Sequence, residues 1–408
     1  MSDSEKDSTI TEKRSKLILP SLVISRFATI TPTLILGLLL VDIAATFECP
    51  VGVAGQLQTT SSLVGLAGAL LVAAISVRYR SASLLMIGIA LLAISALGVY
   101  FSPNLPVMLI LFSLSGLGNT IITPMTSTLV GERFPPGSRS HAMSWLVAGM
   151  SLANVVGAPL IGTMSSLLGW RMVFLVYALP LFLSTLLLAY TAFPYNQNHQ
   201  NTTPAGYLEG FRGVFSSRSA IACLFGFAFA TASYQSILLY SASFYRQRFL
   251  LSMGFVSIIT LTGALFFTVG GLASGRLVNR FGRKTVTVLS ALAACIPILS
   301  FTSLPDPWIS MGLMFLGRFF TGMLVTSANL LSLEQVPKFR GSMMSIGQAA
   351  SMLGSTIGAT VGGWALLVSG YELIGITLGV MMLLTAIVFQ ILSNDPIKTS
   401  NSIRALKT

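Results

Sequence analysis

The sequence predicts an all-α membrane protein whose twelve transmembrane helices form two pseudo-symmetric six-helix bundles. Composition is the first reason: 53% of the 408 residues are apolar, only 9% are charged, and the mean hydropathy is +0.81. Charged residues make up roughly a quarter of a soluble domain, so this chain has too few charges to cover a water-exposed surface. The second reason is the recurrence of apolar runs of about 20 residues, the length that crosses roughly 30 Å of hydrocarbon as a helix. The third is that the second half repeats motifs of the first.

Short, turn-like breaks separate the apolar runs. Examples are SPNLP at 102–106, FPPGS at 134–138 and LPDPW at 304–308, in which proline and glycine interrupt a helix. The runs do not alternate apolar and polar residues as the strands of a membrane barrel do. We therefore expect twelve helical spans, at 18–46, 52–76, 83–101, 106–130, 141–168, 171–193, 218–243, 252–277, 284–303, 308–331, 342–369 and 372–392.

The longest break separates spans six and seven and is rich in asparagine, threonine, proline and glycine. Such a composition is typical of a loop, and we expect it to link the two bundles. The predicted organisation is an N-terminal tail at 1–17, a bundle at 18–193, a linker at 194–217, a bundle at 218–392 and a C-terminal tail at 393–408. The first sixteen residues are polar and lack the pattern of a cleaved signal peptide, so the first apolar run is expected to remain as a span.

The basic residues gather on one side of the predicted spans. An even number of spans places both termini on the same side, and the segments there carry Lys13, Arg14, Lys16, Arg78, Arg80, Arg133, Arg139, Arg212, Arg218, Arg276, Arg280, Arg283, Lys284, Lys338, Arg340, Lys398, Arg404 and Lys407. The opposite side carries Arg171, Arg246 and Arg248. Because cytoplasmic loops have an excess of Lys and Arg, we expect cytoplasmic termini and a location in the plasma or inner membrane. The net charge of +12 then reports topology, and no nucleic-acid partner is needed to explain it.

The sequence does not suggest an enzyme. Cys49, Cys223 and Cys295 have no paired spacing and lie in or beside apolar runs, where cysteine packs as a small apolar residue. His141 and His199 have no metal-ligand spacing, and the chain lacks the phosphate-binding loop of an ATP-driven pump. We therefore expect no catalytic residue, no metal and no cofactor.

The internal repeat has a constant offset of 201 residues. Three pairs of segments follow it in order, Ala142-Met143-Ser144 with Met343-Met344-Ser345, Gly157-Ala158 with Gly358-Ala359, and Gly169-Trp170 with Gly370-Tyr371. Two six-span halves related by a parallel repeat are one of the ways in which secondary transporters achieve alternating access.

The loop between spans eight and nine carries a motif. It reads GRLVNRFGRK and contains Gly275, Asn279, Arg280, Gly282, Arg283 and Lys284. This pattern resembles the Gly-x-Leu-Ala-Asp-Arg-x-Gly-Arg-Arg/Lys signature of the major facilitator superfamily, with Asn279 where that family has Asp. The equivalent loop after span two, AISVRYRSAS, keeps Arg78. The resemblance covers nearly the whole chain and implies that these loops help to close the cytoplasmic side in the outward-facing state. Cations also suit the C-terminal end of a helix.

Span five carries a second motif. The segment GMSLANVVGAPLIG contains Gly149, Gly157, Pro159 and Gly162, and it resembles the Gly-x-x-x-Gly-Pro-x-x-Gly-Gly pattern of the antiporter branch of that family. Its counterpart in span eleven contains Gly354, Gly358 and Gly362. Small residues four positions apart let helices approach closely, and proline bends a span. The resemblance implies that these glycines form the seam about which the halves rock; the alternative is ordinary helix packing.

Two ionisable residues stand out inside the spans that line the central cavity in that family, namely spans one, four, seven and ten. Asp42 lies near the outer end of span one, and Arg318 lies near the middle of span ten. Ionisable residues inside a membrane are costly and usually functional. A carboxyl group partly removed from water prefers its neutral form, so we expect Asp42 to couple protons. We expect Arg318 to bind an anionic group of the substrate or to pair with Asp42. The alternatives are an interfacial or capping role for Asp42 and a static helix contact for Arg318.

Uncharged polar residues on the same spans are further candidates for substrate binding. They are Asn119 in span four, Tyr234, Gln235 and Tyr240 in span seven, and Asn329 in span ten. Each could hydrogen-bond a ligand or simply join two helices.

The sequence therefore predicts a secondary transporter that works by alternating access. The first hypothesis is proton-coupled efflux of small amphipathic or drug-like molecules or metabolites. A second is proton-coupled import of an organic acid or sugar derivative, with Arg318 as the anion anchor. A third is a receptor or assembly partner of the same fold that does not transport. We expect a monomer whose partners are a small-molecule substrate, protons and the lipid bilayer.

Overall fold

The computed structural model describes residues 3–75, 79–193, 212–336 and 340–395, and this part of the chain consists of helices and loops without a strand. Eleven of the described helices are long and apolar enough to cross a membrane. The remaining predicted span, 52–76, is helical up to Ile75, where the described segment ends. The all-α prediction is confirmed.

The first half of the chain supplies six spans. They are α1 (Asp3–Thr46), α2 (Val51–Ala54) with α3 (Gln56–Ile75), α4 (Ser81–Phe101), α5 (Leu105–Arg133), α6 (Pro136–Leu168), and a sixth span built from α7 (Trp170–Met172), the π-helix η1 (Val173–Ala178) and α8 (Leu179–Ala192). The second half supplies α10 (Arg218–Arg248), α11 (Met253–Phe281), α12 (Arg283–Ser300), α13 (Pro307–Gln335), α14 (Arg340–Ser369) and α15 (Tyr371–Leu392). Apart from the start of α1, these bounds lie within about five residues of the predicted spans. The linker predicted at 194–217 falls largely outside the described residues.

Side-chain caps fix the starts of several helices. Oδ1 of Asn104 accepts a hydrogen bond from the backbone N–H of Val107 at 3.0 Å, at the start of α5. Oδ1 of Asp306 accepts from the N–H groups of Trp308 and Ile309 at 2.8 and 3.0 Å, at the start of α13. The first N–H groups of a helix have no acceptor within the helix, so such caps stabilise its start. Both capping residues lie in the breaks that the sequence marks.

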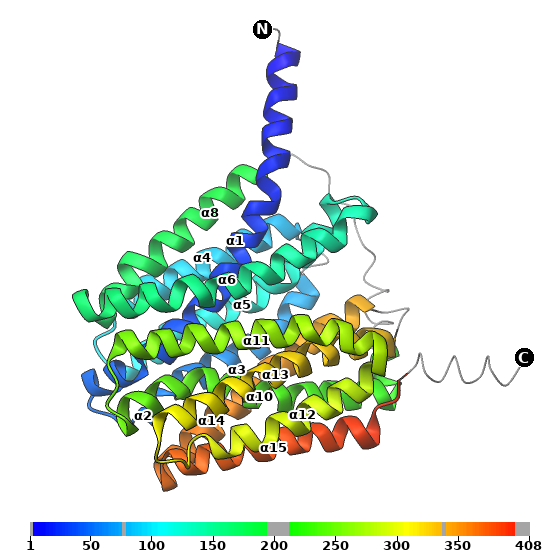
Figure 1. Ribbon diagram of the computed structural model, residues 1–408. Helices are drawn as coiled ribbons and strands as arrows, with labels where there is room; N and C mark the ends of the chain where they lie inside the picture. Colours follow the sequence, from blue (N-terminus) through cyan, green and yellow to red (C-terminus); the bar gives the residue numbers. More distant parts are fainter. Residues whose placement is uncertain (1–2, 76–78, 194–211, 337–339, 396–408) are drawn as a thin grey trace, which may run out of the picture.

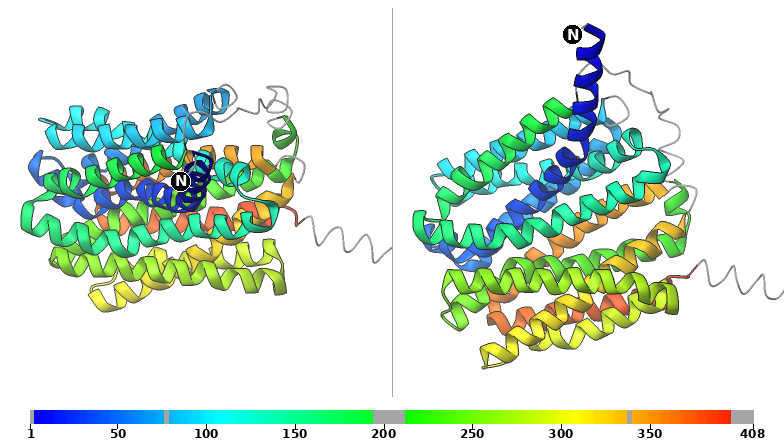
Figure 2. Two further views of the ribbon diagram at one scale, coloured as in Figure 1. Left: turned by 90° about the horizontal axis from the view of Figure 1, so that it is seen from above. Right: turned by 45° about the horizontal axis from the view of Figure 1, so that its top comes forward.

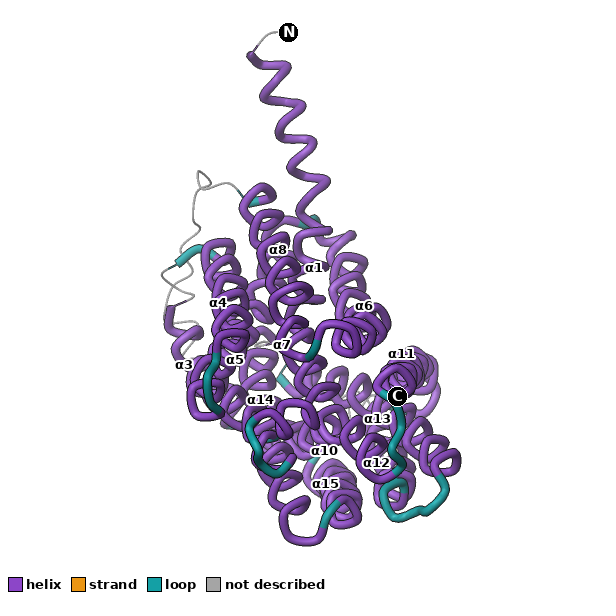
Figure 3. Tube along the Cα trace, turned by 90° about the vertical axis from the view of Figure 1, so that its left-hand side faces the viewer, coloured by secondary structure: helices purple, strands orange, loops and turns teal. Residues whose placement is uncertain are grey.

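The two halves repeat one backbone plan. Gly169 joins α6 to α7 and Gly370 joins α14 to α15, both with positive φ (85° and 74°), a conformation that favours glycine. These are the positions that the repeat pairs. Helix contacts repeat as well: α6 packs on α1 as α14 packs on α10, and α5 packs on α3 and α4 as α13 packs on α11 and α12. Two pseudo-symmetric six-helix halves are thus present, with the second half in the lower part of Figure 1 and of Figure 3.

Two spans contain local breaks that the sequence analysis missed. Span two is interrupted at Gly55, where a Cβ atom would collide with Tyr240 of α10. Span six contains η1, which ends two residues before Pro180. Since Pro180 has no N–H for a carbonyl one turn earlier, the wider π-helical turn accommodates its ring.

The ends of the helices define two faces. We call the face that carries Arg80, Arg133 and Arg283 the basic face, and the face that carries Asp42 and Arg246 the far face. The basic face is on the right of Figure 1, and the far face is on the left. The ends of α1 and α10 at the far face bring Asp42 and Arg246 together.

The helices α1 and α10 lie at the centre of the molecule. In their most apolar stretches 78% and 67% of the residues are buried, whereas no other candidate span exceeds 50%. They also contact each other across the two halves, and Figure 2 shows α1, in dark blue, running among the other helices. The outer helices instead expose large apolar side chains such as Ile110, Leu187 and Ile296, as expected of surfaces that face lipid.

Gly322→Ala is predicted to lower the melting temperature of the purified protein. Gly322 of α13 lies against the backbone of α11, where an added Cβ would collide with the carbonyl oxygen of Phe267. Overpacking of this kind costs about 1–3 kcal/mol. Gly312→Ala on the same helix is the control, because a Cβ there has no neighbour within 4 Å. Equal melting temperatures for the two variants would contradict the observed α11–α13 packing.

Candidate functional site

Asp42 binds Arg246 across the two halves. Its two carboxylate oxygens accept hydrogen bonds from Nη1 and Nη2 of Arg246 at 2.5 and 2.9 Å. Both side chains are partly buried: 30% of the Asp42 side chain and 19% of the Arg246 side chain are exposed. The two parallel bonds use the planar fork of the guanidinium group. The partner considered from the sequence was Arg318, and that pairing was wrong: α10 extends past the predicted end of span seven and carries Arg246 to Asp42.

Contacts between the halves form three lines, which we call the far seam: α1 with α10, α3 with α14, and α6 with α11. In the second line, Oγ of Ser62 donates to Oγ of Ser355 at 2.8 Å, and Oγ1 of Thr360 donates to Oγ1 of Thr59 at 3.3 Å. In the third line, Oγ1 of Thr268 donates to Oγ of Ser151 at 3.4 Å. All of these bonds join the first half of the chain to the second.

Glycines let the backbones meet at the far seam. A Cβ atom at Gly37 of α1 would lie 2.5 Å from the carbonyl oxygen of Leu238 on α10. One at Gly363 of α14 would lie 2.7 Å from the carbonyl oxygen of Gly52 on α2. Helices that approach this closely exclude water from between them, so the far side is closed in this conformation.

Most glycines of the two span motifs face helices of their own half, not the opposite half as expected. Spans five and eleven do contact the opposite half, as α6 with α11 and α14 with α3. Of the motif glycines, however, Gly162 is the one for which an added Cβ would meet the opposite half, at Ser257 of α11. The others face helices of their own half: Gly149 and Gly157 face α1, and Gly354 and Gly358 face α10.

The remaining seam residues complete this correction. Gly362 faces Tyr240 of α10, again within one half, and Pro159 accepts a hydrogen bond from Oγ1 of Thr163 within α6 at 2.9 Å. The prediction that the glycine stripes form the inter-half seam was therefore wrong, except at Gly162. A sequence shows the spacing of small residues but not the direction in which a helix turns them.

The far seam ends near the middle of the helices. Ser62–Ser355 and Ser151–Thr268 are its last hydrogen bonds toward the basic face. Closer to the basic face, the ion pair Arg283–Glu334 and the bonds of Lys284 to Gln390 and Ser393 lie within the second half. Figures 1 and 2 show that α6 and α11 diverge toward the basic face. The halves are therefore closed at the far face and separate toward the basic face.

The segment 275–284, predicted as a loop, forms the last turns of α11, a turn at Gly282 and the start of α12. Its polar contacts lie within the second half. Arg283 pairs with Glu334 of α13 at 3.5 Å. Nζ of Lys284 donates to the carbonyl oxygens of Gln390 and Ser393 at 2.8 and 2.7 Å. Gly282 supplies the turn, with φ at 89°.

The other members of this predicted closing element take no part in those bonds. Arg280 lies over the ring of Phe281, Asn279 is exposed, and a Cβ at Gly275 would have no neighbour within 4 Å. Arg78, predicted to act with them, lies outside the described residues. A closing role for these loops in another conformation stays a prediction.

Arg318 is buried in the second half, with 3% of its surface exposed. Its side chain lies across Gly263 of α11, where a Cβ would stand 2.9 Å from Cδ and 3.4 Å from Nη1. Tyr234 and Tyr245 of α10 are close enough to interact with it electrostatically. Nε and Nη2 are nevertheless buried without a hydrogen-bond partner in the described part of the chain. Since buried polar groups normally have partners, Arg318 stays a candidate for ligand binding.

The uncharged candidates fall into two groups. Oη of Tyr240 donates to the carbonyl oxygen of Ala359 at 2.8 Å, and the ring is 1% exposed, so this residue joins helices in the present conformation. Tyr234 stacks on Phe267 of α11 with ring centroids 4.7 Å apart. Oδ1 of Asn119 is buried without a donor in the described region. Gln235 and Asn329 are partly buried. Substrate binding by these residues stays a prediction.

Arg26 is a residue that the sequence analysis missed. It lies on α1, and its Nε and Nη1 are buried without a hydrogen-bond partner among the described residues. The signal was present, because Arg26 is the one charged residue between Leu17 and Val41 in an apolar run. The central helix α1 thus carries one arginine without a described acceptor, Arg26. The central helix α10 packs against α13, which carries the other, Arg318.

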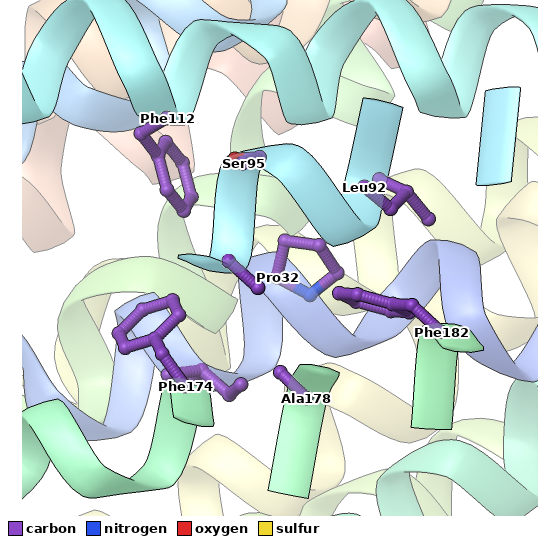
Figure 4. Close-up of a pocket in the computed structure, with 9 residues that line it drawn as sticks. Pro32, Leu92, Ser95, Phe112, Phe174, Ala178 and Phe182 are labelled. Atoms are coloured by element: carbon purple, nitrogen blue, oxygen red, sulfur yellow. The ribbon is translucent and has the colours of Figure 1, made fainter. Parts of the chain in front are cut away.

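Two pockets among the described residues contain none of the predicted site residues. One is a small, mostly apolar pocket inside the first half, lined by Pro32, Leu92, Phe112, Phe174 and Phe182 among others (Figure 4). The second is a groove between α11 and α13 beside Phe255 and Trp308. The described residues also contain no cluster of three or more His, Cys, Asp or Glu side chains that could hold a metal ion. The candidate site consequently rests on Arg26, Arg318 and the far seam.

Comparisons with known proteins agree with this architecture. The family model of the Major Facilitator Superfamily matches residues 22–267 and 228–407. A putative metabolite transport protein of Haemophilus influenzae is 25% identical over 372 residues, covering 88% of this chain and 89% of that protein. The purine ribonucleoside efflux pump NepI of Shigella dysenteriae is 25% identical over 363 residues, covering 86% and 87%. The crystal structure of a D-xylose–proton symporter superposes with a TM-score of 0.78 at 16% identity, covering 93% of this chain and 98% of that one.

Cysteines placed at Ser62 and Ser355 are predicted to form a disulfide in a background without the three native cysteines. The two hydroxyl oxygens are 2.8 Å apart, so the substituted sulfur atoms can meet with little backbone movement. Mass spectrometry after mild oxidation measures the bond, and each single cysteine variant is the control. Failure of the pair to cross-link in any condition would contradict the observed seam.

Proposed function

Because the chain belongs to the Major Facilitator Superfamily, and is therefore a multi-pass membrane transporter and not an enzyme, we propose that it exports small polar metabolites by alternating access. Relatives named for the efflux of purine ribonucleosides and of sugars support the direction and the substrate class. Buried acceptors without a described donor, Oδ1 of Asn119 and of Asn154, also favour a polar substrate. We infer a monomer, because each half completes its bundle within one chain.

The proposed orientation places the basic face in the cytoplasm. The described part of this face carries Arg80, Arg133 and Arg218 at helix ends, together with the cations of the segment 275–284 between α11 and α12. The described far face carries Arg171, Arg246 and Arg248, two of which bind carboxylates. The positive-inside rule then supports cytoplasmic termini in a plasma or inner membrane. In this orientation, the two halves are in contact on the external side of the membrane and separate toward the cytoplasm.

The single observation that carries the proposal is the far seam. It closes one side of the molecule while the halves separate toward the other, and this is one of the two states that alternating access requires. Export then needs the opposite state, in which the far seam opens and the halves close at the basic face. The segment 275–284, with its exposed Arg280 and Asn279 at the end of α11, is proposed to help close that face.

Protons are proposed to act through Asp42. Protonation of Asp42 removes the negative charge that holds Arg246, and so it favours the conformation open to the far side. The two other cations of the described far face are engaged elsewhere: Arg171 lies over the rings of Phe47 and Trp170, and Arg248 pairs with Glu372 at 3.5 Å. The nearest other carboxylate along the chain is that of Glu48, which is exposed. A low external pH would thus promote opening at the step where an exporter releases its substrate.

Asp42→Asn is predicted to shift the population toward the outward-open state. An ion pair this exposed contributes about 1 kcal/mol, which corresponds to roughly a fivefold change in the ratio of the two states. Spin labels at Ala45 and Leu250, both exposed on the far face, would report the shift as a longer distance. Acidification should lengthen that distance in the parent protein and leave it unchanged in the variant. A pH response that survives in Asp42→Asn would remove Asp42 from this role.

Transport by purified protein in sealed vesicles is the direct test of export. We expect adenosine or a pentose to move from the basic-face side of the vesicle membrane and to accumulate on the far-face side when the far-face side is made more acidic. Accumulation in the opposite direction would instead identify an importer. Absence of flux for a broad panel of metabolites, with folded protein, would favour the receptor hypothesis over both.

A further inference from the structure

We propose that the groove between α11 and α13 binds one acyl chain of a membrane lipid, in the leaflet on the side of the far face. The groove has a volume of about 270 Å³. Its lining includes Ile258 and Trp308, which are 53% and 67% exposed, so it opens on the outer surface of the second half. The site does not involve the far seam, and it is independent of the substrate and direction proposed for transport.

The two helices line the groove at matching depth. Both begin at the far face, α11 at Met253 and α13 at Pro307, and both run toward the basic face. The lining residues are Phe255, Ile258, Ile259 and Thr262 of α11, and Trp308, Met311, Gly312 and Phe315 of α13. Within each helix they are three or four positions apart and therefore share one face. They lie within about ten residues of the helix starts, or about 15 Å, which is half of a hydrocarbon layer of roughly 30 Å.

An aromatic pair bounds the groove at each end. Phe255 and Trp308 meet edge to face near the far face, with ring centroids 6.0 Å apart. Phe266 and Phe315 stack farther along the same helices, with ring centroids 5.4 Å apart. Tryptophan is enriched where the membrane meets water, so the outer pair marks the level of the lipid headgroups. The groove leads from that level into the hydrocarbon.

Gly312 leaves the groove open between these pairs. A Cβ atom there would have no neighbour within 4 Å. Ile259 and Met311 form an apolar floor, with 4% and 5% of their surfaces exposed. An apolar cavity of about 150 Å³ stays dry and binds benzene, so a groove of this volume has room for a stretch of hydrocarbon chain.

The chemistry of the lining selects an acyl chain. The hydroxyl group of Thr262 is the one polar side-chain group among the lining residues, and none of these residues is charged. In a multi-pass membrane protein, a groove at this depth faces the acyl chains of the bilayer. A chain inside the groove contacts α11 and α13 together, whereas a chain on a convex helix surface contacts one helix. The added dispersion contacts favour retention of a chain in the groove.

Photolabelling of the full-length protein tests this site. Vesicles of phosphatidylethanolamine and phosphatidylglycerol would contain a small fraction of phosphatidylcholine with a diazirine in its acyl chain, and mass spectrometry would locate the adducts. We expect several-fold more adduct at Ile258 than at Ile296 of α12. Ile296 is the control because it lies at a similar distance from the far-face end of its helix and is more exposed, at 73% against 53%. Equal or weaker labelling at Ile258 would overturn the proposal.

Gly312→Leu fills the groove and should reduce labelling at Ile258 to the level found at Ile296. Gly254→Leu is the matched control, because a Cβ at Gly254 also has no neighbour within 4 Å and Gly254 lies outside the groove; its labelling should equal that of the parent protein. Undiminished labelling in Gly312→Leu, with the melting temperature showing folded protein, would contradict the site. Should Gly312→Leu fail to fold, the comparison of Ile258 with Ile296 in the parent protein decides. Unlabelled groove residues in a protein that chemical cross-linking shows to be dimeric would assign the groove to a second copy and reject the lipid.

Discussion

The far seam must hold one side of the molecule closed and still come apart in every transport cycle. Its chemistry suits both requirements. Within each half, helices interlock through apolar side chains and close glycine contacts, as at Gly322 against Phe267. Across the halves, the described polar contacts are side-chain hydrogen bonds such as Ser62–Ser355 and the ion pair Asp42–Arg246, and backbones approach one another at glycines such as Gly37. Since apolar burial gives no net drive between helices in lipid, and hydrogen bonds there average about 0.6 kcal/mol, the far seam can close without becoming permanent.

Most of the fold could be predicted from the sequence because its determinants are local. Apolar runs of membrane length set the spans, and residues in the breaks, such as Asn104 and Asp306, cap the helices that follow. The repeat of Gly169 at Gly370 fixed the division into two halves, and both glycines adopt the positive φ that their positions require. The local breaks were not evident in this way: Gly55 lies against Tyr240 of the other half, a contact between residues far apart in the sequence.

The candidate site was predictable only in part, because side chains meet according to helix rotation and helix ends. Asp42 and Arg246 lie 204 positions apart, and their pairing depends on α10 continuing one turn past its expected end. Gly354 and Gly358 have the spacing of a seam, yet rotation of α14 turns them toward α10 of the same half. Arg318 stood out because it lies in mid-span. Arg26 became evident as a candidate only when its guanidinium was found without an acceptor.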